Sequence, residues 1–535
     1  MAGLTIRSTP GVMRLYFLCL YFGIGASVWG YNIGILSSIL VHPGWKDALG
    51  YPSPSIRGTI AGVYYLGTLI SYIFVSHPVS DWLGRRYAAL SGTLVVCIGA
   101  LLQALSGGAT ARATMIFGRM ISGVGVAIVS TSVPLYQAEI SPAKKRGHFV
   151  TMNHVGFIAG IATGLWVGYG MRYWKSEAGI HYGWRLSIIL EIIPALIFGI
   201  GLPWIPETPR WLVENGKKDR ARSTLRWLRE GSYSDEQIEQ EFGAIVKNID
   251  EYHRSGKNWL SLFKERALFA RLWRAALLQF MAQACGATSM KYYLPSLLEA
   301  LGVEVRVALM AGAIEMTIKI GFTVLEMFII DRFGRRNCLV AGCAVMAFSM
   351  LINGALPIAY PNNVSKVADV ICIIFIFTYA LGFSLGFGPA AWVYNTEIFP
   401  TSVRARGLNF AAAGGSIASI LVTEIWPVGI SALGSKVYFF FMAVNLICIP
   451  VLFAFYPETK GWELEDMDAL FGSVERRQTD HDGLRSLDQI LRSVTNCANV
   501  DLSEHLLRDD AQYRDSEESA AAATRDRDRD LSLIQ

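Results

Sequence analysis

Charged residues recur in a pattern suited to ion pairs that form and part. Residues 81–86 read Asp-Trp-Leu-Gly-Arg-Arg, and residues 331–336 read Asp-Arg-Phe-Gly-Arg-Arg. Each copy has a carboxylate, a glycine for a tight turn and two cations, and these can pair with Glu139 and Glu397 further along the chain. Such pairs suit a gate that opens and closes, while anchoring of loops by arginine to lipid phosphate is the simpler alternative.

A second set of charges lies inside apolar segments. Glu315 precedes Lys319 by four residues, a spacing at which the two interact on one helix face. An ionisable residue in a membrane helix is costly and is a functional-site hypothesis. Lys319 therefore either neutralises Glu315 or contacts a solute. Lys291 is expected to extend to the headgroups, and His154 is either a core histidine or a ligand.

Several classes of function are excluded. No nucleophile and base, and no metal-ligand cluster, is found in the soluble segments, so we expect neither an enzyme nor a cofactor or metal. The basic residues form short clusters between apolar segments, so nucleic acid is not an expected partner. Seven of the eight cysteines lie in apolar segments and none forms a CxxC pair, which argues against disulfides and zinc.

Composition indicates the elements that position these residues. The 535-residue chain is 52% hydrophobic and only 17% charged. Apolar stretches of about twenty residues can each cross a bilayer as a helix. The predicted spans are 14–36, 58–80, 88–106, 113–137, 148–171, 184–204, 271–299, 306–330, 337–359, 367–396, 407–432 and 436–456.

The loops predict the orientation. The loops on one side carry clustered arginines and lysines, which mark the cytoplasmic face. Both termini then lie in the cytoplasm, and the sequon at Asn363 falls outside as a glycosylation site. The residues expected at the cytoplasmic gate are Asp81, Arg85, Arg86, Glu139, Arg146, Glu207, Arg210, Asp331, Arg335, Arg336, Glu397, Arg404 and Glu458.

Three motifs recur in order at a distance of roughly 250 residues, which indicates two related six-helix halves. Parallel repeats of this size are typical of the major facilitator plan, with a solute site at mid-membrane. We expect an N-terminal half over 1–204, a cytoplasmic linker with amphipathic helices over 205–270, a C-terminal half over 271–456 and a mostly disordered tail over 457–535.

The chain resembles the sugar porter family of the major facilitator superfamily over roughly residues 14–470, and its fungal members most closely. The motifs that carry the resemblance are Gly30-Tyr31-Asn32-Ile33-Gly34, Gly118-Arg119, Pro206-Glu207-Thr208-Pro209-Arg210, Gln283, Tyr292-Tyr293, Gly388-Pro389-Ala390-Ala391-Trp392 and Pro457-Glu458-Thr459-Lys460-Gly461. The resemblance implies an all-α integral membrane fold of 12 spans.

The resemblance also implies a sugar site. Amides suit a hydroxyl because they donate and accept together. The implied substrate-binding residues are His154, Gln283, Thr288, Lys319, Trp392, Tyr292 and Tyr293. This chain departs from the family by losing amides and gaining potential cations, so an acidic solute such as a uronate or quinate is an alternative to a neutral sugar.

Coupling to protons depends on one position. Proton-coupled relatives have Asp where this chain has Asn32, opposite Arg119, and an amide cannot titrate. Facilitated diffusion is therefore the first expectation, with Glu315 in a coupling or switch role. A proton-linked transporter of an acidic solute and a nutrient sensor are the alternatives. We expect a plasma-membrane protein with lipid neighbours and, as a plausible state, a monomer.

Overall fold

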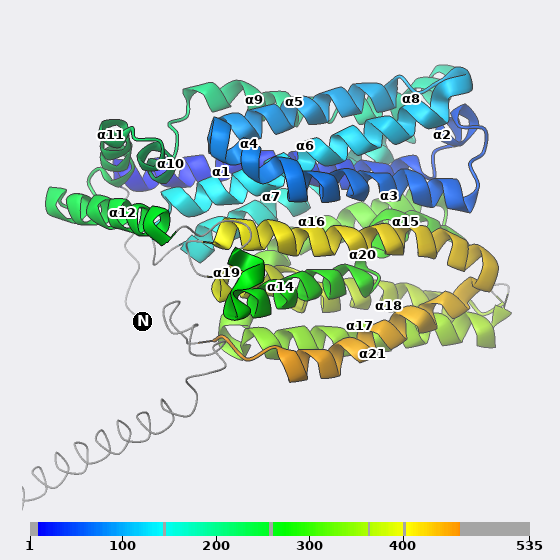
Figure 1. Cartoon of the computed structure of the whole chain (residues 1–535). Helices are drawn as coiled ribbons and strands as arrows, with labels where there is room; N and C mark the ends of the chain where they lie inside the picture. The colour runs from blue at the N-terminus through cyan, green and yellow to red at the C-terminus, as the bar shows by residue number, and fades with distance from the viewer. Residues whose placement is uncertain (1–8, 143–145, 256–260, 362–363, 400–402, 461–535) are drawn as a thin grey trace, which may run out of the picture. The chain divides into compact units, whose positions relative to one another are not determined.

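The computed structural model describes residues 9–142, 146–255, 261–361, 364–399 and 403–460. Within these ranges all regular secondary structure is helical. All of them belong to one unit that extends to Met467. Figure 1 shows the long helices running alongside one another, with α10–α12 at one end of them.

We call α1–α9 the first half. Apolar sequence and few breakers produce long helices here. Their bounds are α1 Pro10–Ile39, α2 Pro43–Ala48, α3 Pro54–Ile70, the π-helix η1 Ser71–Val75, α4 Ser76–Leu83, α5 Arg85–Ala104, α6 Ala111–Ile140, α7 Arg146–Met171, α8 Glu177–Ile189 and α9 Ile192–Gly201.

We call α14–α21 the second half. Its helices are α14 Arg266–Ala284, α15 Ala287–Ala300, α16 Val305–Phe333, α17 Arg335–Ala359, α18 Lys366–Leu385, α19 Pro389–Ile398, α20 Arg404–Leu433 and α21 Val437–Phe455. Between the halves lie α10 Pro209–Glu214, α11 Lys218–Arg229, α12 Asp235–Ser255 and α13 Ser261–Lys264. α5 begins after Gly84 and α17 begins after Gly334. We name the end of the molecule that holds these two glycines and α10–α12 the basic end.

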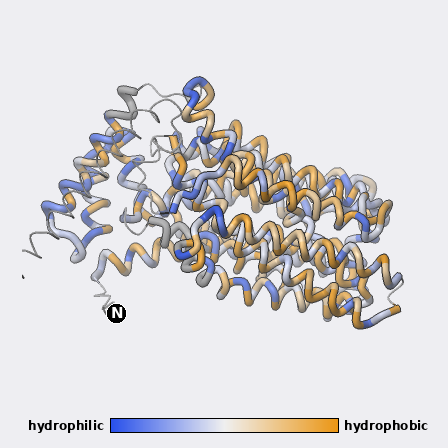
Figure 2. The backbone as a smooth tube through the Cα atoms, turned by 90° about the horizontal axis from the view of Figure 1, so that it is seen from below, coloured by the Kyte–Doolittle hydropathy of each residue, from blue (hydrophilic) through white to orange (hydrophobic). Residues whose placement is uncertain are grey.

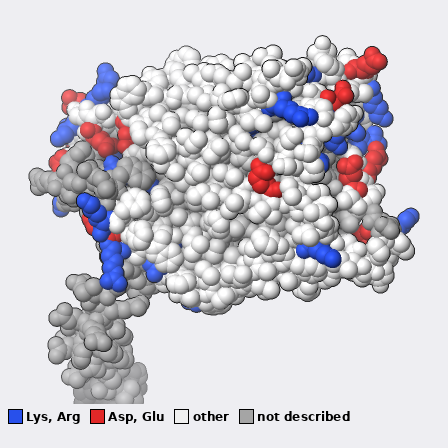
Figure 3. Space-filling model, turned by 45° about the vertical axis from the view of Figure 1, so that its right-hand side comes forward, with Lys and Arg blue, Asp and Glu red and all other residues white. Residues whose placement is uncertain are grey.

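The long helices are membrane-spanning segments. Eight stretches of the described chain are long and apolar enough to cross a bilayer, and the stretch Arg406–Phe455 holds both α20 and α21. With α7, α14–α15 and α16 they make up the twelve spans of the predicted fold. Figure 2 shows hydrophobic residues along these helices, and Figure 3 shows charges gathered mainly at the two ends of the face in view.

Three predicted continuous spans are wrong in detail because each is broken. The break at Gly286 separates α14 from α15 with φ 102°, a conformation that favours glycine. The carbonyl of Cys285 beside it accepts bonds from Tyr379 Oη at 3.1 Å and Asn445 Nδ2 at 3.1 Å. Similar breaks separate α8 from α9 and α18 from α19. Backbone N–H and C=O groups that lose their helical hydrogen bonds inside a membrane need other partners. A hydropathy profile cannot predict these partners.

Helices α1 and α7 approach closely because glycine faces glycine or backbone along their contact. A Cβ at Gly30 would overlap the carbonyl oxygen of Phe157, and one at Gly156 would overlap that of Gly23. Small residues at helix contacts let backbones approach in membranes. This packing holds the first span, and with it Asn32, firmly against the fifth.

The repeated turns have one physical cause in both halves. Gly84 has φ 89° and ψ 164°, and Gly334 has φ 91° and ψ 157°, a region open almost only to glycine. The carboxylate of Glu458 then accepts from the backbone nitrogens of Arg335 at 2.8 Å and Arg336 at 3.0 Å. A carboxylate at a helix N-terminus satisfies free N–H groups and the helix dipole.

We predict that Gly84→Ala and Gly334→Ala each lower the free energy of unfolding by about 2 kcal/mol. A Cβ would meet Glu207 Oε2 at 2.5 Å in the first case and Glu458 Oε2 at 2.6 Å in the second. Thermal unfolding in detergent measures the effect. Gly170→Ala and Gly321→Ala are matched controls, because nothing lies within 4 Å of either added Cβ. Equal melting temperatures for all four variants would contradict this account of the turns.

Candidate functional site

Asn32 bridges two buried groups of opposite charge. Arg119 on α6 donates from Nη1 to Asn32 Oδ1 at 2.6 Å. Asn32 Nδ2 in turn donates to both oxygens of Glu191, at 3.0 and 3.2 Å. All three side chains are 1% exposed. The amide thus uses both of its functions at once, which an aspartate could not do.

The surroundings compensate the buried charge. The Arg119 guanidinium lies 4.6 Å from the centroid of the Tyr64 ring, a cation–π contact. Its Nε and Nη2 have no hydrogen-bond partner among the described residues. Glu191 occupies the break between α8 and α9, where the backbone turn brings its carboxylate inward. Arg119 and Glu191 have opposite formal charges, and the amide of Asn32 joins them.

The seventh span carries the polar groups expected to meet a solute. Thr288 donates from Oγ1 to Gln283 Oε1 at 2.8 Å and lies 3.2 Å from Ser419 Oγ on α20. The buried hydroxyl of Tyr293 has no hydrogen-bond partner in the described part of the chain, whereas that of Tyr292 lies near the Tyr65 hydroxyl and the Arg119 guanidinium. Trp392 on α19 is 38% exposed, which leaves its ring free for stacking.

Two lysines flank one aromatic ring, which the sequence did not indicate. Lys291 Nζ lies 4.8 Å and Lys319 Nζ lies 5.3 Å from the centroid of Phe383. The expectation that Lys291 extends to the headgroups is therefore wrong. Lys319 and Glu315 make no ion pair within 4.0 Å among the described residues, but their opposite charges still attract each other, and Glu326 attracts Lys319 as well.

Two further polar groups lie on these elements. His154 on α7 has a buried Nε2 without a described partner, and its ring lies 5.9 Å from that of Phe157. Glu326 on α16 is 2% exposed, and its two oxygens have no hydrogen-bond partner in the described ranges. Sequence reasoning missed Glu326, although an acidic residue inside a predicted span was a usable signal.

The gate residues pair within each half. Arg85 Nη2 lies 3.0 Å from Glu139 Oε1 and Arg335 Nη2 lies 2.9 Å from Glu397 Oε1. The hydroxyls of Thr208 and Thr459 donate to the same two carboxylates, at 2.5 and 2.7 Å. The predicted pairing of the turn arginines with Glu139 and Glu397 is therefore observed, and each described pair joins residues of the same half. These pairs join each turn to the helices of its own half.

The remaining gate residues are only partly defined. Glu207 accepts from the backbone nitrogens of Arg86 at 3.2 Å and Thr208 at 2.9 Å. Burial raises the pKa of Glu207 above its ordinary value, and those two bonds oppose the rise. Arg210 lies on α10 near Glu214. The side chains of Arg146, Asp331 and Arg404, and the sequon residue Asn363, lie outside the described set.

The two halves meet through polar contacts along α20. Thr131 donates to Asn409 Oδ1 at 3.0 Å, and the hydroxyls of Thr68 and Ser416 are 2.8 Å apart. On the other side Trp166 donates from Nε1 to Thr317 Oγ1 at 3.1 Å, between α7 and α16. Single hydroxyl and amide bonds are weak enough to exchange for water when the halves separate.

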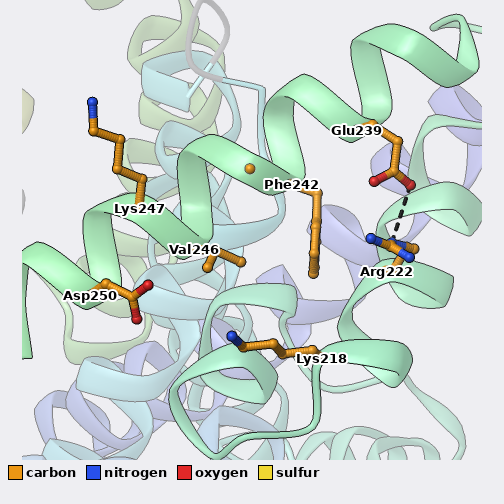
Figure 4. Close-up of a pocket in the computed structure, with 8 residues that line it drawn as sticks. Lys218, Arg222, Glu239, Phe242, Val246, Lys247 and Asp250 are labelled. Carbon is orange, nitrogen blue, oxygen red and sulfur yellow. Dashed lines mark ion pairs between the residues drawn. The ribbon is translucent and has the colours of Figure 1, made fainter.

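A hollow of 510 Å³ lies apart from these groups, between α11 and α12. Figure 4 shows Phe242 and Val246 at its wall and charged residues of both signs around it, with Arg222 Nε 3.1 Å from Glu239 Oε1. The helices themselves pack through apolar residues such as Leu225 and Ile238. With mixed charge and no inward polar cluster, this hollow is a poor candidate for the transport site.

Comparison with known proteins supplies the context for this geometry. The Sugar (and other) transporter family matches residues 18–471. The chain is similar to the MFS-type transporter criB of Aspergillus cristatus, at 29% identity over 88% of this chain and 96% of that protein. It is also similar to a quinate permease of Neurospora terricola, at 28% identity over 87% and 90% of the two chains.

A solved structure has the same fold. The proton:xylose symporter XylE, bound to 6-bromo-6-deoxy-D-glucose, superposes with a TM-score of 0.73 at 24% identity, covering 86% of this chain and 100% of that one. At this identity the likeness concerns the fold alone.

We predict that Asn32→Ala lowers the free energy of unfolding by about 3 kcal/mol, because two buried charged groups lose their shared partner. Ser37→Ala is the matched control on the same helix, since the buried Ser37 hydroxyl has no described partner. Thermal unfolding in detergent at neutral pH compares the two. A melting temperature for Asn32→Ala equal to that of Ser37→Ala would refute a structural role for the bridge.

Proposed function

Since the chain belongs to the Sugar (and other) transporter family, which matches residues 18–471, we propose that it carries a sugar-like polyhydroxylated solute by alternating access. It is a multi-pass membrane transporter, not an enzyme. The observation that supports the choice of solute is the buried Tyr293 hydroxyl, which has no hydrogen-bond partner in the described part of the chain, on the same span as the amide of Gln283. Buried polar atoms without partners are rare, and solute hydroxyls would supply partners.

The proposed route passes between the two halves. α20 contacts α3 and α6, and α16 contacts α7, so the halves meet along two lines of helices. We assign the halves to residues 1–204 and 271–456, the linker to 205–270 and a cytoplasmic tail to 457–535. The basic end faces the cytoplasm in this proposal because it carries the arginine clusters, and the plasma membrane is the proposed location.

Facilitated diffusion is the proposed mode of transport. Proton coupling needs a group that gains and loses a proton as the conformation changes. Asn32 cannot do so, and its amide already joins Arg119 to Glu191 through hydrogen bonds. Glu191 favours the second candidate, proton-linked transport, because it is a buried carboxylate that can take up a proton and its hydrogen bonds in the described contacts come from the Asn32 amide.

A second candidate solute bears a carboxylate. Lys291 and Lys319 converge on Phe383, and neither has a described ion-pair partner within 4.0 Å. A solute carboxylate would satisfy two desolvated ammonium groups, while the ring of Phe383 packs on the carbon skeleton. The similarity to quinate permeases supports the same substrate class.

The mode of transport can be tested in proteoliposomes. We expect labelled solute to equilibrate and to show counterflow, but not to accumulate against its gradient when an inward pH gradient is imposed. Glu191→Gln should then leave the equilibrium level unchanged. Accumulation that a protonophore abolishes would contradict facilitated diffusion, and its loss in Glu191→Gln would assign the coupling to Glu191.

The solute class can be tested by competition. We expect glucuronate to compete better than glucuronamide, which has the same shape without the charge. In Lys291→Met and Lys319→Met this preference should fall about tenfold, as expected when one of two charged partners is removed. Lys436→Met, at an exposed helix end, is the matched control. An unchanged preference in both pocket variants would exclude the carboxylate site.

A further inference from the structure

His77 joins the two halves at the basic end. It is buried on α4, in the first half, directly after the π-helix η1. Arg406, near the start of α20 in the second half, donates from Nε to His77 Nε2 at 3.3 Å. No sequence motif pointed to His77, because its partner lies 329 residues away.

The two bonds of the ring define its protonation. An imidazole nitrogen accepts a hydrogen bond only when it carries no proton. Nε2 accepts from Arg406, so the proton of the neutral ring lies on Nδ1, which is 2.9 Å from Asp81 Oδ2. The contact with Arg406 therefore requires neutral His77.

We propose that His77 is a proton-sensitive latch between the halves, closed when the imidazole is neutral and released when it is protonated. A proton on Nε2 replaces an acceptor by a donor and puts a cation against the guanidinium of Arg406. Both the hydrogen bond and the favourable electrostatics at this contact are lost. Imidazole is suited to this role because its charge changes near neutral pH.

The charged groups around the ring determine the balance. On α4 the carboxylate of Asp81 faces the ring, and on α20 the guanidinium of Arg406 faces the ring and also attracts Asp81. Arg85 on α5 lies 3.4 Å from Asp81 Oδ1 and is itself paired with Glu139 on α6 and, at 4.0 Å, with Glu214 on α10. When the halves part, Arg406 withdraws while Asp81 stays on the same helix.

Acid therefore shifts the equilibrium toward the parted state, because protonation removes the acceptor that the closed contact needs. A difference of one unit in the pKa between the two states corresponds to a tenfold shift in their ratio. The neighbouring contacts, Thr131 with Asn409 and Thr68 with Ser416, involve only hydroxyl and amide groups and do not titrate in this range. The inference rests on alternating access, but it does not depend on the identity of the solute.

A distance measurement on the purified full-length protein tests the latch. Trp82 on α4 and Phe333 on α16 are exposed at the basic end, in different halves, and accept spin labels through genetically encoded residues that leave the cysteines intact. We expect the ratio of long to short distances to rise at least about threefold between pH 8.0 and pH 5.5. No solute is needed, so a failed transport assay and a failed latch are distinguishable.

Three variants assign the response. His77→Gln keeps an acceptor for Arg406 but cannot titrate, so the short distance should persist at both pH values. His77→Phe removes the acceptor, so the long distance should increase at both. Thr131→Ala weakens a neighbouring contact and should keep the pH response. A wild-type distribution that ignores pH, or a His77→Gln response equal to that of the wild type, would overturn the proposal.

Discussion

A charge in hydrocarbon has no water to stabilise it, and this constraint governs where every ionisable residue of the spans lies. Arg119 and Glu191 are tolerated because Asn32 joins them and Tyr64 covers the cation. Lys291 and Lys319 rest on the face of Phe383. The charged turns lie at the helix ends, where carboxylates meet arginines and free backbone N–H groups. Each of these solutions uses a different partner.

The same constraint explains why the contacts within each half differ from those between the halves. Strong pairs such as Arg85 with Glu139 and Arg335 with Glu397 stay within one half, so they need not break during a cycle. The described polar contacts between the halves are single bonds of hydroxyl, amide and indole groups, together with the bond from the Arg406 guanidinium to the His77 imidazole. In the proposed alternating-access cycle, this arrangement would keep each half rigid while the free-energy difference between the states remains small.

Much of the fold could be predicted from the sequence because hydropathy and repetition are local signals. The spans near 113–137 and 337–359 match α6 and α17 closely. The breaks at Gly286 and Glu191 could not be found in this way, since they depend on partners such as Asn445 and Asn32 from distant helices. The resemblance to the family predicted that Asn32 faces Arg119. The hydrogen bonds from Asn32 to Glu191 could be found only in the structure.

The candidate site shows the same limit. The spacing of Glu315 and Lys319 predicted an ion pair, but the side chain of Lys319 turns to Phe383 from another helix. Lys291 was predicted to extend to the headgroups because it lies near a helix end. The break at Gly286 starts a new helix, α15, and so changes the direction in which the Lys291 side chain points. Side-chain direction depends on such local irregularities, which no periodicity encodes.

The π-helix at Ser71–Val75 has a consequence for the neighbouring helix face. A π turn accommodates one residue more than an α turn, so every later side chain is rotated by about 100° about the helix axis. Without that wide turn, the imidazole of His77 would be directed away from Arg406, whereas Thr68, which precedes the turn, would keep its register with Ser416. This one irregular turn thus sets the rotation of α4 about the helix axis independently of that of α3.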